Sequence, residues 1–409
     1  MKTLILLAWR NIWRNKRRTL ITAASVLFAV FLSSFMVSIQ TGAWDKMVDN
    51  MVTYYFGYAQ VHQDGYWEDR TLDNSFALSA AQEQLPADLQ ENIGLVPRIE
   101  SFALASTGEL TMGVMVVGTE PEAENAMTKL ADRVVEGSYF QTDQPSALLA
   151  EGVAEKLKLS VGDTLILISQ GYRGTNAAGK YVIQGITRFG SPELNKQMVF
   201  LPLQEAQYFY RAESLITSLA IHVDKSKVEP TVRALKANLQ EDQYEVMDWE
   251  ELLPALVEAK EVDAAGNYIV LLVLYVIIGF GIFGTVLMMT KERQYEFGVM
   301  TAIGMSRGRL ALVTWMEIVF LGMIGALAGI LVSIPLVYYF HINPIDMGAM
   351  QQGMDDAYEK FGMEPIIPAA FDLTIFLGNA FTIFIITTLL SIYPIINIFR
   401  LKPVEAMRA

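Results

Sequence analysis

The chain has 409 residues, of which 52% are hydrophobic, and it carries a formal net charge of −13 at pH 7. It contains no cysteine, which excludes disulfide bonds within these residues. The hydrophobic share exceeds the roughly 45–50% of soluble domains and therefore favours a protein that resides in a membrane.

The first eighteen residues are basic and amphipathic. They hold six Lys and Arg and no acidic residue, and Trp9 and Trp13 lie one helical turn apart. Aromatic rings beside basic side chains are typical of a helix at the inner membrane interface. We therefore predict an elbow helix over residues 1–18; a disordered basic leader is the alternative.

Four apolar runs are long enough to cross a bilayer, whose hydrocarbon core of about 30 Å needs about 20 helical residues. The predicted spans are residues 19–40, 266–290, 310–340 and 371–399. The first run is longer than the apolar part of a typical signal peptide, and no clear small-residue cleavage site follows it, so we expect it to be retained. The sequence thus predicts an integral membrane α-helical protein with four transmembrane helices.

The distribution of charge predicts which side of the membrane each segment faces. Residues 1–18, the connector 291–309 and the tail 400–409 together hold 13 Lys and Arg against three Asp and Glu, whereas the rest holds 18 against 41. Basic residues favour the cytoplasmic side. We therefore expect both termini and the connector in the cytoplasm, and residues 41–265 and the acidic loop 341–370 outside the membrane.

Residues 41–265 have the mixed pattern of a large α+β domain carried on helical stalks. Apolar residues at three- and four-residue spacing from Trp44 to Tyr55 predict the first stalk, and Asp248–Asp263 predicts the second. Between the stalks, strands are predicted at Ala147–Leu149, Thr164–Ile168, Tyr181–Ile186, Met198–Leu201 and Leu219–Val223. Helices are predicted at Ser79–Asn92, Glu122–Asp132, Glu151–Lys158 and Val228–Glu241. The glycine-rich stretch Gly171–Lys180 predicts an exposed hairpin loop.

The connector between the second and third spans carries charges of both signs. Lys291–Ile303 is predicted to form a short helix that ends at Gly304, a natural residue for the left-handed position after a helix. Ser306 is a plausible N-cap for the next helix. Such a helix would lie across the cytoplasmic surface and present one side to a docking partner; an ordinary interfacial loop is the alternative.

Three stretches resemble the MacB/FtsX-like family of ABC transporter permeases. They are "AWRNIWRNKRRTLIT" at 8–22, "KERQYEFGVMTAIGMSRGRL" at 291–310 and "YPIINIFRLKPVEAMRA" at 393–409. They are similar to the family's N-terminal elbow, its connector and its closing segment. Within the family, the chain looks most like the lipoprotein-releasing branch, LolC and LolE.

The resemblance implies a mechanotransmission permease whose connector is a coupling helix seated on a cytoplasmic ATPase dimer. The positions that match the coupling motif are Glu292, Arg293, Glu296, Gly298, Ala302, Gly304 and Ser306. Relatives often have basic residues where Met300 and Thr301 stand. These residues contain no GxxxxGK[ST] loop, so we expect no enzyme activity here, ATP and Mg²⁺ on the separate ATPase, and a second permease copy or a paralogue as partner.

The same resemblance implies a lipoprotein cargo that is passed to a periplasmic carrier from the inner membrane. The candidate surface for its acyl chains comprises Met47, Val48, Met51, Val52, Tyr55, Tyr268 and Leu272, with packing of stalk against stalk as the alternative. The candidate carrier-facing loop comprises Gly171, Tyr172, Arg173 and Gly174. A MacB-like efflux permease with a periplasmic adaptor, or an FtsX-like transducer that controls a cell-wall hydrolase, are the alternative functions.

Two further observations concern single residues. The three histidines, His62, His222 and His341, have no neighbours at metal-ligand spacing, so we expect no metal site. Glu317 lies inside the third span, where a carboxylate is costly and is a functional candidate by default. The role we expect for it is an interhelical hydrogen bond near the inner interface.

Overall fold

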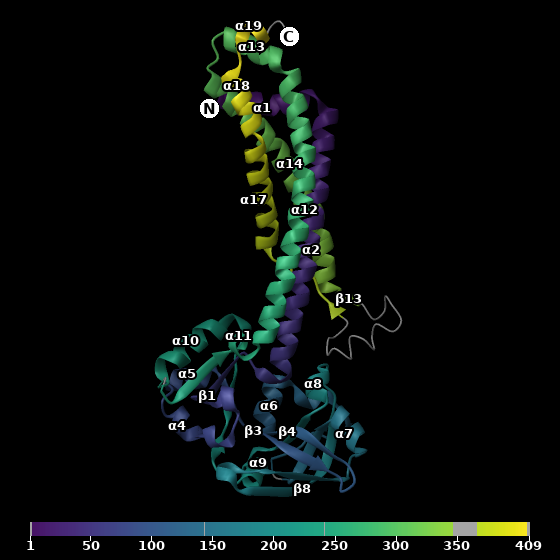
Figure 1. The fold of residues 1–409 in the computed structure, drawn as a ribbon, viewed down its shortest axis with the longest axis vertical. Helices are drawn as coiled ribbons and strands as arrows, with labels where there is room; N and C mark the ends of the chain where they lie inside the picture. The colour runs from purple at the N-terminus through teal and green to yellow at the C-terminus, as the bar shows by residue number, and fades with distance from the viewer. Residues whose placement is uncertain (1, 143, 241, 347–365, 407–409) are drawn as a thin grey trace. The chain divides into compact units, whose positions relative to one another are not determined.

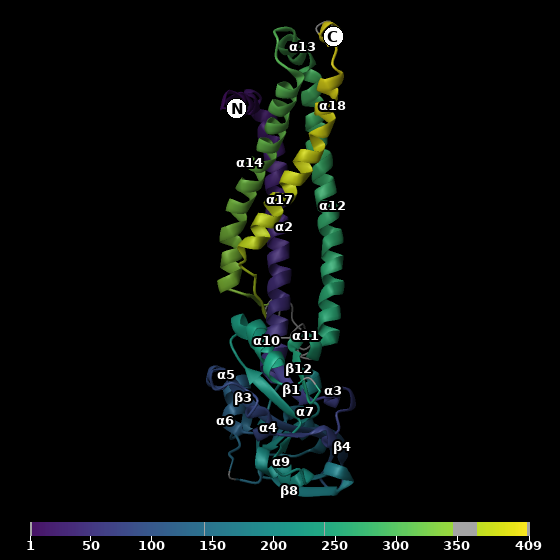
Figure 2. The same cartoon turned by 90° about the vertical axis from the view of Figure 1, so that its left-hand side faces the viewer.

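The computed structural model describes residues 2–142, 144–240, 242–346 and 366–406. They divide into two compact units (Figures 1 and 2). The helical unit contains residues 1–46, 259–345 and 366–409, and the mixed unit contains residues 47–258 together with 346–365. Most of the loop predicted at 341–370 lies outside the described residues.

The helical unit is built from long helices joined by short ones. Its elements are α1 (Lys2–Arg14), α2 (Lys16–Met51), α12 (Pro254–Glu292), α13 (Gln294–Ala302), α14 (Arg307–Ile342), α17 (Leu373–Leu390), α18 (Ile392–Arg400) and α19 (Pro403–Ala406). Among the described residues, four helical segments are long and apolar enough to cross a membrane: Lys16–Phe56, Pro254–Glu292, Arg307–Ile342 and Leu373–Arg400. The predicted run 371–399 is divided into two helices at Ser391, which keeps helical dihedral angles of φ −70° and ψ −15°.

Glycines let α14 approach α2 closely. A Cβ atom on Gly325 would lie 2.6 Å from Cβ of Val26 and 2.7 Å from the carbonyl oxygen of Ala23. A Cβ atom on Gly329 would lie 2.7 Å from the carbonyl oxygen of Leu27. Small residues four apart are the usual means by which membrane helices bring their backbones together.

A polar cluster joins three of the long helices. Asn379 of α17 accepts hydrogen bonds from Ser33 of α2, at 3.1 Å, and from Tyr275 of α12. Its amide donates to Ser34 of α2 at 3.0 Å. Hydrogen bonds of this kind hold membrane helices together where the hydrophobic effect between helices is absent.

Six strands of the mixed unit close into a barrel. They are β3 (Gly94–Ser106), β4 (Thr111–Thr119), β9 (Met198–Pro202), β6 (Ser146–Ala150), β8 (Asn176–Thr187) and β7 (Thr164–Gln170). Each pairs with the next, and β7 pairs back onto β3. The fully buried side chains of Val116, Leu148, Leu165 and Phe200 belong to its core. β5 (Val134–Gly137) continues the sheet beyond β8.

The first half of β3 belongs to a second layer. Residues Gly94–Arg98 pair with β11 (Ser218–His222), which continues through β1 (Ala59–Gln63) to β12 (Tyr244–Asp248). Around the two layers lie α3 (Tyr66–Asp69), α4 (Leu78–Gln82), α5 (Ala87–Asn92), α6 (Pro121–Thr128), α7 (Glu151–Leu157), α8 (Pro192–Asn195), α9 (Leu203–Tyr210), α10 (Val228–Asn238) and α11 (Trp249–Leu252). The short strands β2 (Phe76–Ala77) and β10 (Leu215–Ile216) form a separate pair.

The five predicted strands are confirmed, but several other expectations are wrong. β1, β3, β4, β5 and β12 were not predicted, since polar or small residues interrupt their apolar pattern. The helix predicted at Ser79–Asn92 is broken before Pro86, and the stalk helix predicted at Asp248–Asp263 is broken at Leu253, because proline restricts the residue before it. The hairpin loop is short, since β8 already begins at Asn176.

A buried arginine joins three elements of the mixed unit. Arg98 of β3 is fully buried, and its guanidinium donates to both carboxylate oxygens of Glu124 in α6 at 2.6 and 2.8 Å. It also donates to the carbonyl oxygen of Tyr55 at 2.7 Å, at the π-helical turn Val52–Phe56 that follows α2. Burial opposes the charged form, but Glu124 outweighs it and raises the pKa of Arg98.

Arg98→Met is expected to destabilise the protein by about 3–5 kcal/mol, because it leaves the Glu124 carboxylate buried without its counter-charge. Chemical denaturation of the full chain in detergent, followed by the fluorescence of the mixed unit, measures the loss. Arg233→Met is the matched control, since Arg233 pairs with Glu229 on the surface of α10 and both side chains are largely exposed. Equal effects of the two substitutions would contradict the role given to Arg98.

Gly325→Val is expected to cost about 1–3 kcal/mol, because the added atoms would overlap the backbone of α2. The melting temperature of the detergent-solubilised chain measures the effect. Gly378→Val is the control, since a Cβ atom at Gly378 of α17 would meet nothing within 4 Å. A Gly325→Val protein as stable as the control would show that α2 and α14 do not pack in this way.

Candidate functional site

The three segments that carry the family resemblance meet at one end of the helical unit. α1 contains the elbow, α13 the connector, and α18 and α19 the closing segment as far as Ala406 (Figures 1 and 2). α1 packs on α14 through Ala8, Val313 and Met316, and α19 packs on α13. The remaining residues of the closing segment, 407–409, lie outside the described residues.

The connector is a separate helix with a sharp break at each end. α12 ends at Glu292, Arg293 takes a non-helical conformation, and α13 begins at Gln294. Gly304 has φ of +107°, and the amide of Met305 donates back to the carbonyl of Met300 at 3.0 Å. The role of Gly304 at the end of this helix is thus confirmed. Ser306 stands at the N-cap position of α14, but its side chain makes no capping hydrogen bond there.

One side of α13 is buried against the closing segment. Phe297 is 1% exposed and packs with Leu310, Ile398, Leu401 and Ala406. Arg307 of α14 adds two hydrogen bonds of 2.9 Å, from its guanidinium to the carbonyl oxygens at the end of α18. A cation at a helix C-terminus also interacts favourably with the helix dipole. The closing segment therefore packs against the buried side of α13 and holds this helix in place.

A second side of α13 is held to the elbow by ion pairs. The guanidinium of Arg14 contacts both carboxylate oxygens of Glu296, at 2.9 and 3.0 Å. Just before α13 begins, Arg18 of α2 contacts both oxygens of Glu292, the last residue of α12, at 2.6 and 2.7 Å. Burial raises the pKa of Glu296, but the hydrogen bonds and charges of Arg14 and Arg293 outweigh burial, so that this pKa is lowered overall. Glu296 is therefore held ionised at neutral pH.

The third contact of the connector reaches a carboxylate inside a membrane helix. Glu317 lies ten residues, or roughly 15 Å, along α14 and is 3% exposed. One of its oxygens accepts from the guanidinium of Arg293, and the other accepts from the side-chain amide of Asn11 in α1. Glu317 thus makes the interhelical contacts expected for it, and Arg293 is its buried counter-charge.

The charged motif residues have partners within the chain, while their predicted role in coupling to an ATPase stays a prediction. Glu292 at the end of α12 pairs with Arg18 of α2, and Glu296 of α13 pairs with Arg14 of α1. Arg293, directly before α13, pairs with Glu317 of α14. Gly298 is buried, whereas Ala302, Gly304 and Ser306 are exposed. The acidic motif residues therefore position the connector and do not form its free face.

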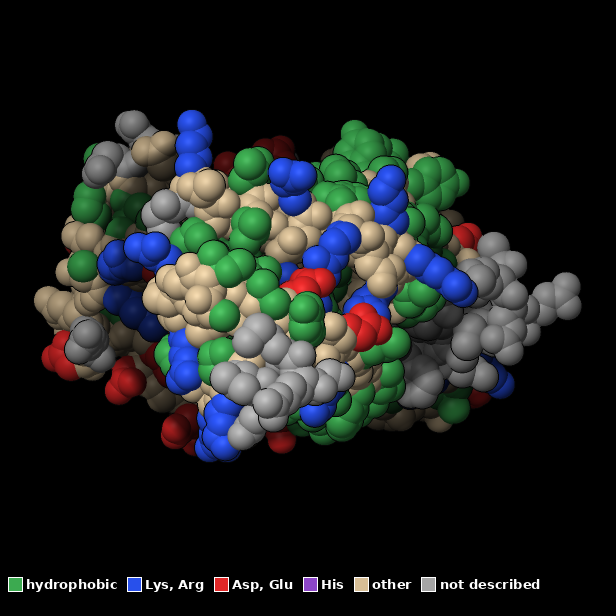
Figure 3. Space-filling view, turned by 90° about the horizontal axis from the view of Figure 1, so that it is seen from above, with side chains coloured by type: hydrophobic (Ala, Val, Ile, Leu, Met, Phe, Trp, Pro, Cys, Tyr) green, Lys and Arg blue, Asp and Glu red, His purple; other side chains and the backbone are tan. Residues whose placement is uncertain are grey.

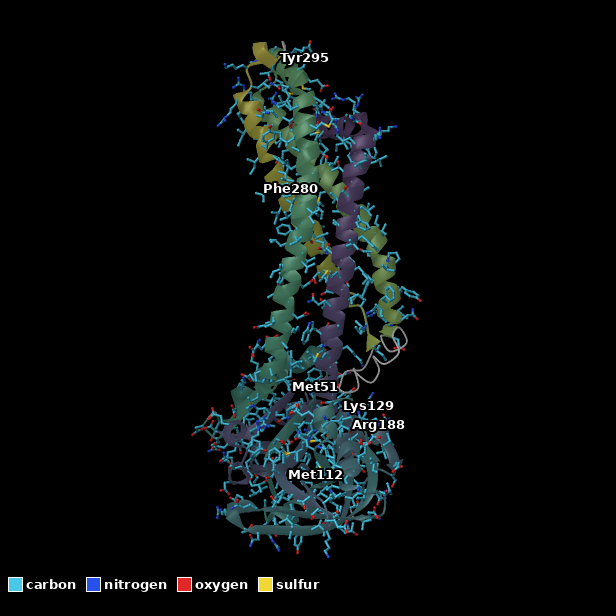
Figure 4. All side chains as sticks on the ribbon, turned by 45° about the vertical axis from the view of Figure 1, so that its right-hand side comes forward. Met51, Met112, Lys129, Arg188, Phe280 and Tyr295 are labelled. Atoms are coloured by element: carbon cyan, nitrogen blue, oxygen red, sulfur yellow. The ribbon has the colours of Figure 1, made fainter. Side chains whose placement is uncertain are left out.

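The free face of the connector contains two large apolar side chains that the sequence analysis missed. Tyr295 is 56% exposed and Ile303 is 82% exposed. Tyr295 lies at the tip of the helical unit (Figure 4), and basic side chains with a few acidic ones surround this end (Figure 3). The sequence did contain a signal for them. Tyr295 and Ile303 are apolar residues between the motif positions of a short polar connector, where no buried core is expected.

The predicted apolar stalk surface does not form as one surface. Val48, Val52 and Tyr55, which belong to the mixed unit, are buried, at 4%, 1% and 8% exposure. Met47 and Met51 are half-buried. Tyr268 and Leu272 on α12 are 72% and 63% exposed. Only these last two keep the free apolar surface that the prediction required.

The predicted carrier-facing loop is a tight turn. Gly171 is buried, Tyr172 packs against the core, and Arg173 and Gly174 are exposed. The backbone amide of Arg173 donates to Asp73 at 2.9 Å, which fastens the turn to a neighbouring segment. The predicted hairpin between two strands is confirmed, but its loop ends before Asn176, where β8 begins.

The same stretch is close to a phosphate-binding motif in sequence only. Residues 174–181 read GTNAAGKY, with Tyr181 where a P-loop has Ser or Thr. From Asn176 onward they form strand β8, so their amides belong to the sheet. Among the described residues, no group of three His, Cys, Asp or Glu could hold a metal ion.

Membrane-length helices with a mixed α/β domain between the first and second of them define a membrane permease with an extracytoplasmic domain. Residues 19–237 match the model of the MacB-like periplasmic core domain, and residues 268–403 match that of the FtsX-like permease C-terminal domain. The chain therefore belongs to the MacB/FtsX-like permease family.

Relatives of two kinds are similar to the chain. The lipoprotein-releasing system transmembrane protein LolC of Neisseria meningitidis is 22% identical over 60% of this chain and 61% of its own length. LolE of Haemophilus influenzae is 23% identical over 62% and 63%. The macrolide export ATP-binding/permease protein MacB of Nitrobacter winogradskyi is 24% identical over 96% of this chain and 58% of its own length. The chain thus spans about three fifths of these relatives.

Among solved structures, the periplasmic region of MacB from Actinobacillus actinomycetemcomitans is similar over 51% of this chain and 97% of its own. The sequence identity is 11% and the TM-score is 0.36. The assignment to the family rests on the two domain matches.

Removing either partner of the Arg293–Glu317 pair is expected to destabilise the helical unit by about 3–5 kcal/mol, because each leaves a buried charge alone. Arg293→Met and Glu317→Leu made together should recover most of that loss. Melting temperatures of the four proteins in detergent measure the coupling. Lys291→Met, at an exposed neighbour, is the control. A double variant whose loss equals the sum of the single losses would contradict the pairing.

Proposed function

We propose that this chain is the permease subunit of a mechanotransmission-type ABC transporter in the bacterial inner membrane. A separate cytoplasmic ATPase dimer, which binds ATP and Mg²⁺, drives it, and a second permease copy or a paralogue completes the complex. All four long helices cross the membrane with both termini in the cytoplasm. The substrate is a lipoprotein, which the complex releases toward a periplasmic carrier.

The observation that carries the proposal is the way α13 is mounted. Two sides of this nine-residue helix are fixed, one by apolar packing on α18 and α19 and one by the ion pair of Glu296 with Arg14 of α1. The remaining side presents Tyr295 and Ile303 to solvent. A helix that must transmit force needs rigid support behind it and an apolar anchor in front, because aromatic anchors carry much of the binding energy of interfaces.

The charge of the connecting segments supports the proposed topology. The elbow, connector and tail contain 13 of the 31 Lys and Arg and only three of the 44 Asp and Glu. This asymmetry is the signature of cytoplasmic segments. It supports a cytoplasmic position for the free face of α13, on the side where ATP is available.

Lipoprotein as the substrate is supported by the matches to LolC and LolE and by the surface of α12. Tyr268, Leu272 and Phe280 are 72%, 63% and 72% exposed along this helix, and Phe280 is marked in Figure 4. Each acyl CH₂ transferred out of the bilayer costs about 0.8 kcal/mol, so extraction needs an apolar receiving surface and coupled ATP hydrolysis. Export in the manner of MacB is the second candidate, because that match extends over 96% of the chain.

Tyr295→Ala combined with Ile303→Ser is expected to abolish co-purification of the ATPase, since the apolar anchor of the interface is removed. The protein should still insert in the membrane and keep its melting temperature, because both side chains are exposed. Tyr208→Ala is the matched control, with a tyrosine 60% exposed on the mixed unit. Unchanged ATPase recovery with the double variant would overturn the proposed docking face.

The substrate is tested by mass spectrometry of the complex purified in mild detergent. Co-purifying triacylated peptide or lipoprotein, lost when Leu272→Glu is introduced on α12, is the expected result. Recovery of a periplasmic adaptor without lipoprotein would instead favour the efflux permease. A melting temperature of the Leu272→Glu protein equal to that of the wild type controls for misfolding.

A further inference from the structure

A cavity lies beside the connector, within the helical unit. Its volume is about 380 Å³, and it is enclosed by α1, α2, α12, α13 and α14. That volume is far larger than the share of one water molecule, roughly 30 Å³, and falls in the range of sites for small organic groups. Neither the coupling of α13 nor the passage of a lipoprotein uses this space.

We propose that this cavity binds the headgroup of a phosphatidylethanolamine molecule from the inner leaflet. The inference rests on the proposed topology, which places this end of the helices at the cytoplasmic face. It goes beyond the transport function, because the lipid is a resident ligand and not the cargo.

The charged lining of the cavity is balanced. It contains three arginines and three glutamates: Arg14, Arg18, Arg293, Glu292, Glu296 and Glu317. An anionic lipid would bring an uncompensated negative charge to this lining. A zwitterionic headgroup brings a phosphate for the guanidinium groups and an ammonium for the carboxylates, and it leaves the net charge unchanged.

The exposure of the pairs indicates which groups meet the ligand. Arg18 and Glu292 are 20% and 46% exposed, and Arg14 and Glu296 are 53% and 35% exposed. These four groups can exchange a partner with a ligand, whereas Arg293 and Glu317, at 7% and 3%, remain paired beneath them. Guanidinium groups bind phosphate strongly through parallel hydrogen bonds.

The carboxylates distinguish ethanolamine from choline. A primary ammonium donates three hydrogen bonds, and Glu292 and Glu296 each offer two acceptor oxygens. A quaternary ammonium has no N–H and is recognised instead by the faces of aromatic rings. The residues that line the cavity include no aromatic side chain, so the lining favours ethanolamine.

The lining of the cavity also has an apolar part, the apolar wall. Val286 and Met289 of α12 and Ile318 and Leu321 of α14 form this wall. The start of an acyl chain is the apolar group that follows the phosphate headgroup and the glycerol esters in a bilayer. The combination of balanced charges with an apolar wall therefore fits a lipid better than free phosphate.

The test measures phospholipid that stays bound to the full chain after extensive washing in detergent. Native mass spectrometry of wild-type protein incubated with phosphatidylethanolamine, phosphatidylglycerol or phosphatidylcholine should show about one retained phosphatidylethanolamine per chain. Arg18→Gln combined with Glu292→Gln keeps the lining neutral and should lower that retention at least tenfold. Arg233→Gln with Glu229→Gln, a charge pair on the surface of the mixed unit, is the matched control and should retain the lipid.

A second variant keeps the test valid if the first variant misfolds. Leu321→Trp fills the apolar wall, leaves every charge in place and should also lower retention. Equal retention of the three lipids, unchanged retention in both cavity variants, or equal retention of soluble phosphoethanolamine or inorganic phosphate would overturn the proposal. The readout needs no ATPase, so loss of lipid binding is distinguishable from failure of the docking face at Tyr295.

Discussion

The structure depends on how the acidic residues of the connector are used. Glu292 and Glu296 form ion pairs with arginines of the elbow, and Arg293 reaches the buried Glu317. These contacts convert a short helix between two membrane helices into part of a rigid corner. Without them, α13 would be joined to the bundle only by its two ends and by apolar packing. A force applied to α13 would then move this helix without moving the bundle.

The corner also explains why distant parts of the sequence carry one resemblance. The elbow supplies Arg14 and Arg18, and the closing segment supplies Ile398, Leu401 and Ala406 beneath Phe297. Each segment alone is a short, unremarkable stretch of basic or apolar residues. Together they fix the position of a single helix, so that a change in any of them acts on the same mechanical element. The cavity lies in this corner, which gives a bound lipid a means of influencing the connector.

Local chemistry made some of these features predictable. The long apolar runs, the end of α13 at Gly304 and the five apolar strands follow from length, periodicity and backbone preference. The partners of the charged residues do not. Glu292 and Arg18 are 274 positions apart, and no local pattern distinguishes an acid that faces a partner protein from one that pairs within the chain. Strand β3 was missed for a related reason. Arg98 and Glu100 give it the composition of a loop, and only the distant Glu124 accounts for a buried arginine.

The most direct test of the account is a distance between the elbow and the connector. The chain has no cysteine, so Arg10→Cys on α1 and Ala302→Cys on α13, both at exposed positions, provide a single pair of spin-label sites. Pulsed electron resonance on the complex with the proposed ATPase should give one narrow distance that is the same without nucleotide and with ATP. A distance that broadens, or that shifts between the two states by more than about one helical turn of 5.4 Å, would show that the connector moves independently of the elbow and would contradict the account.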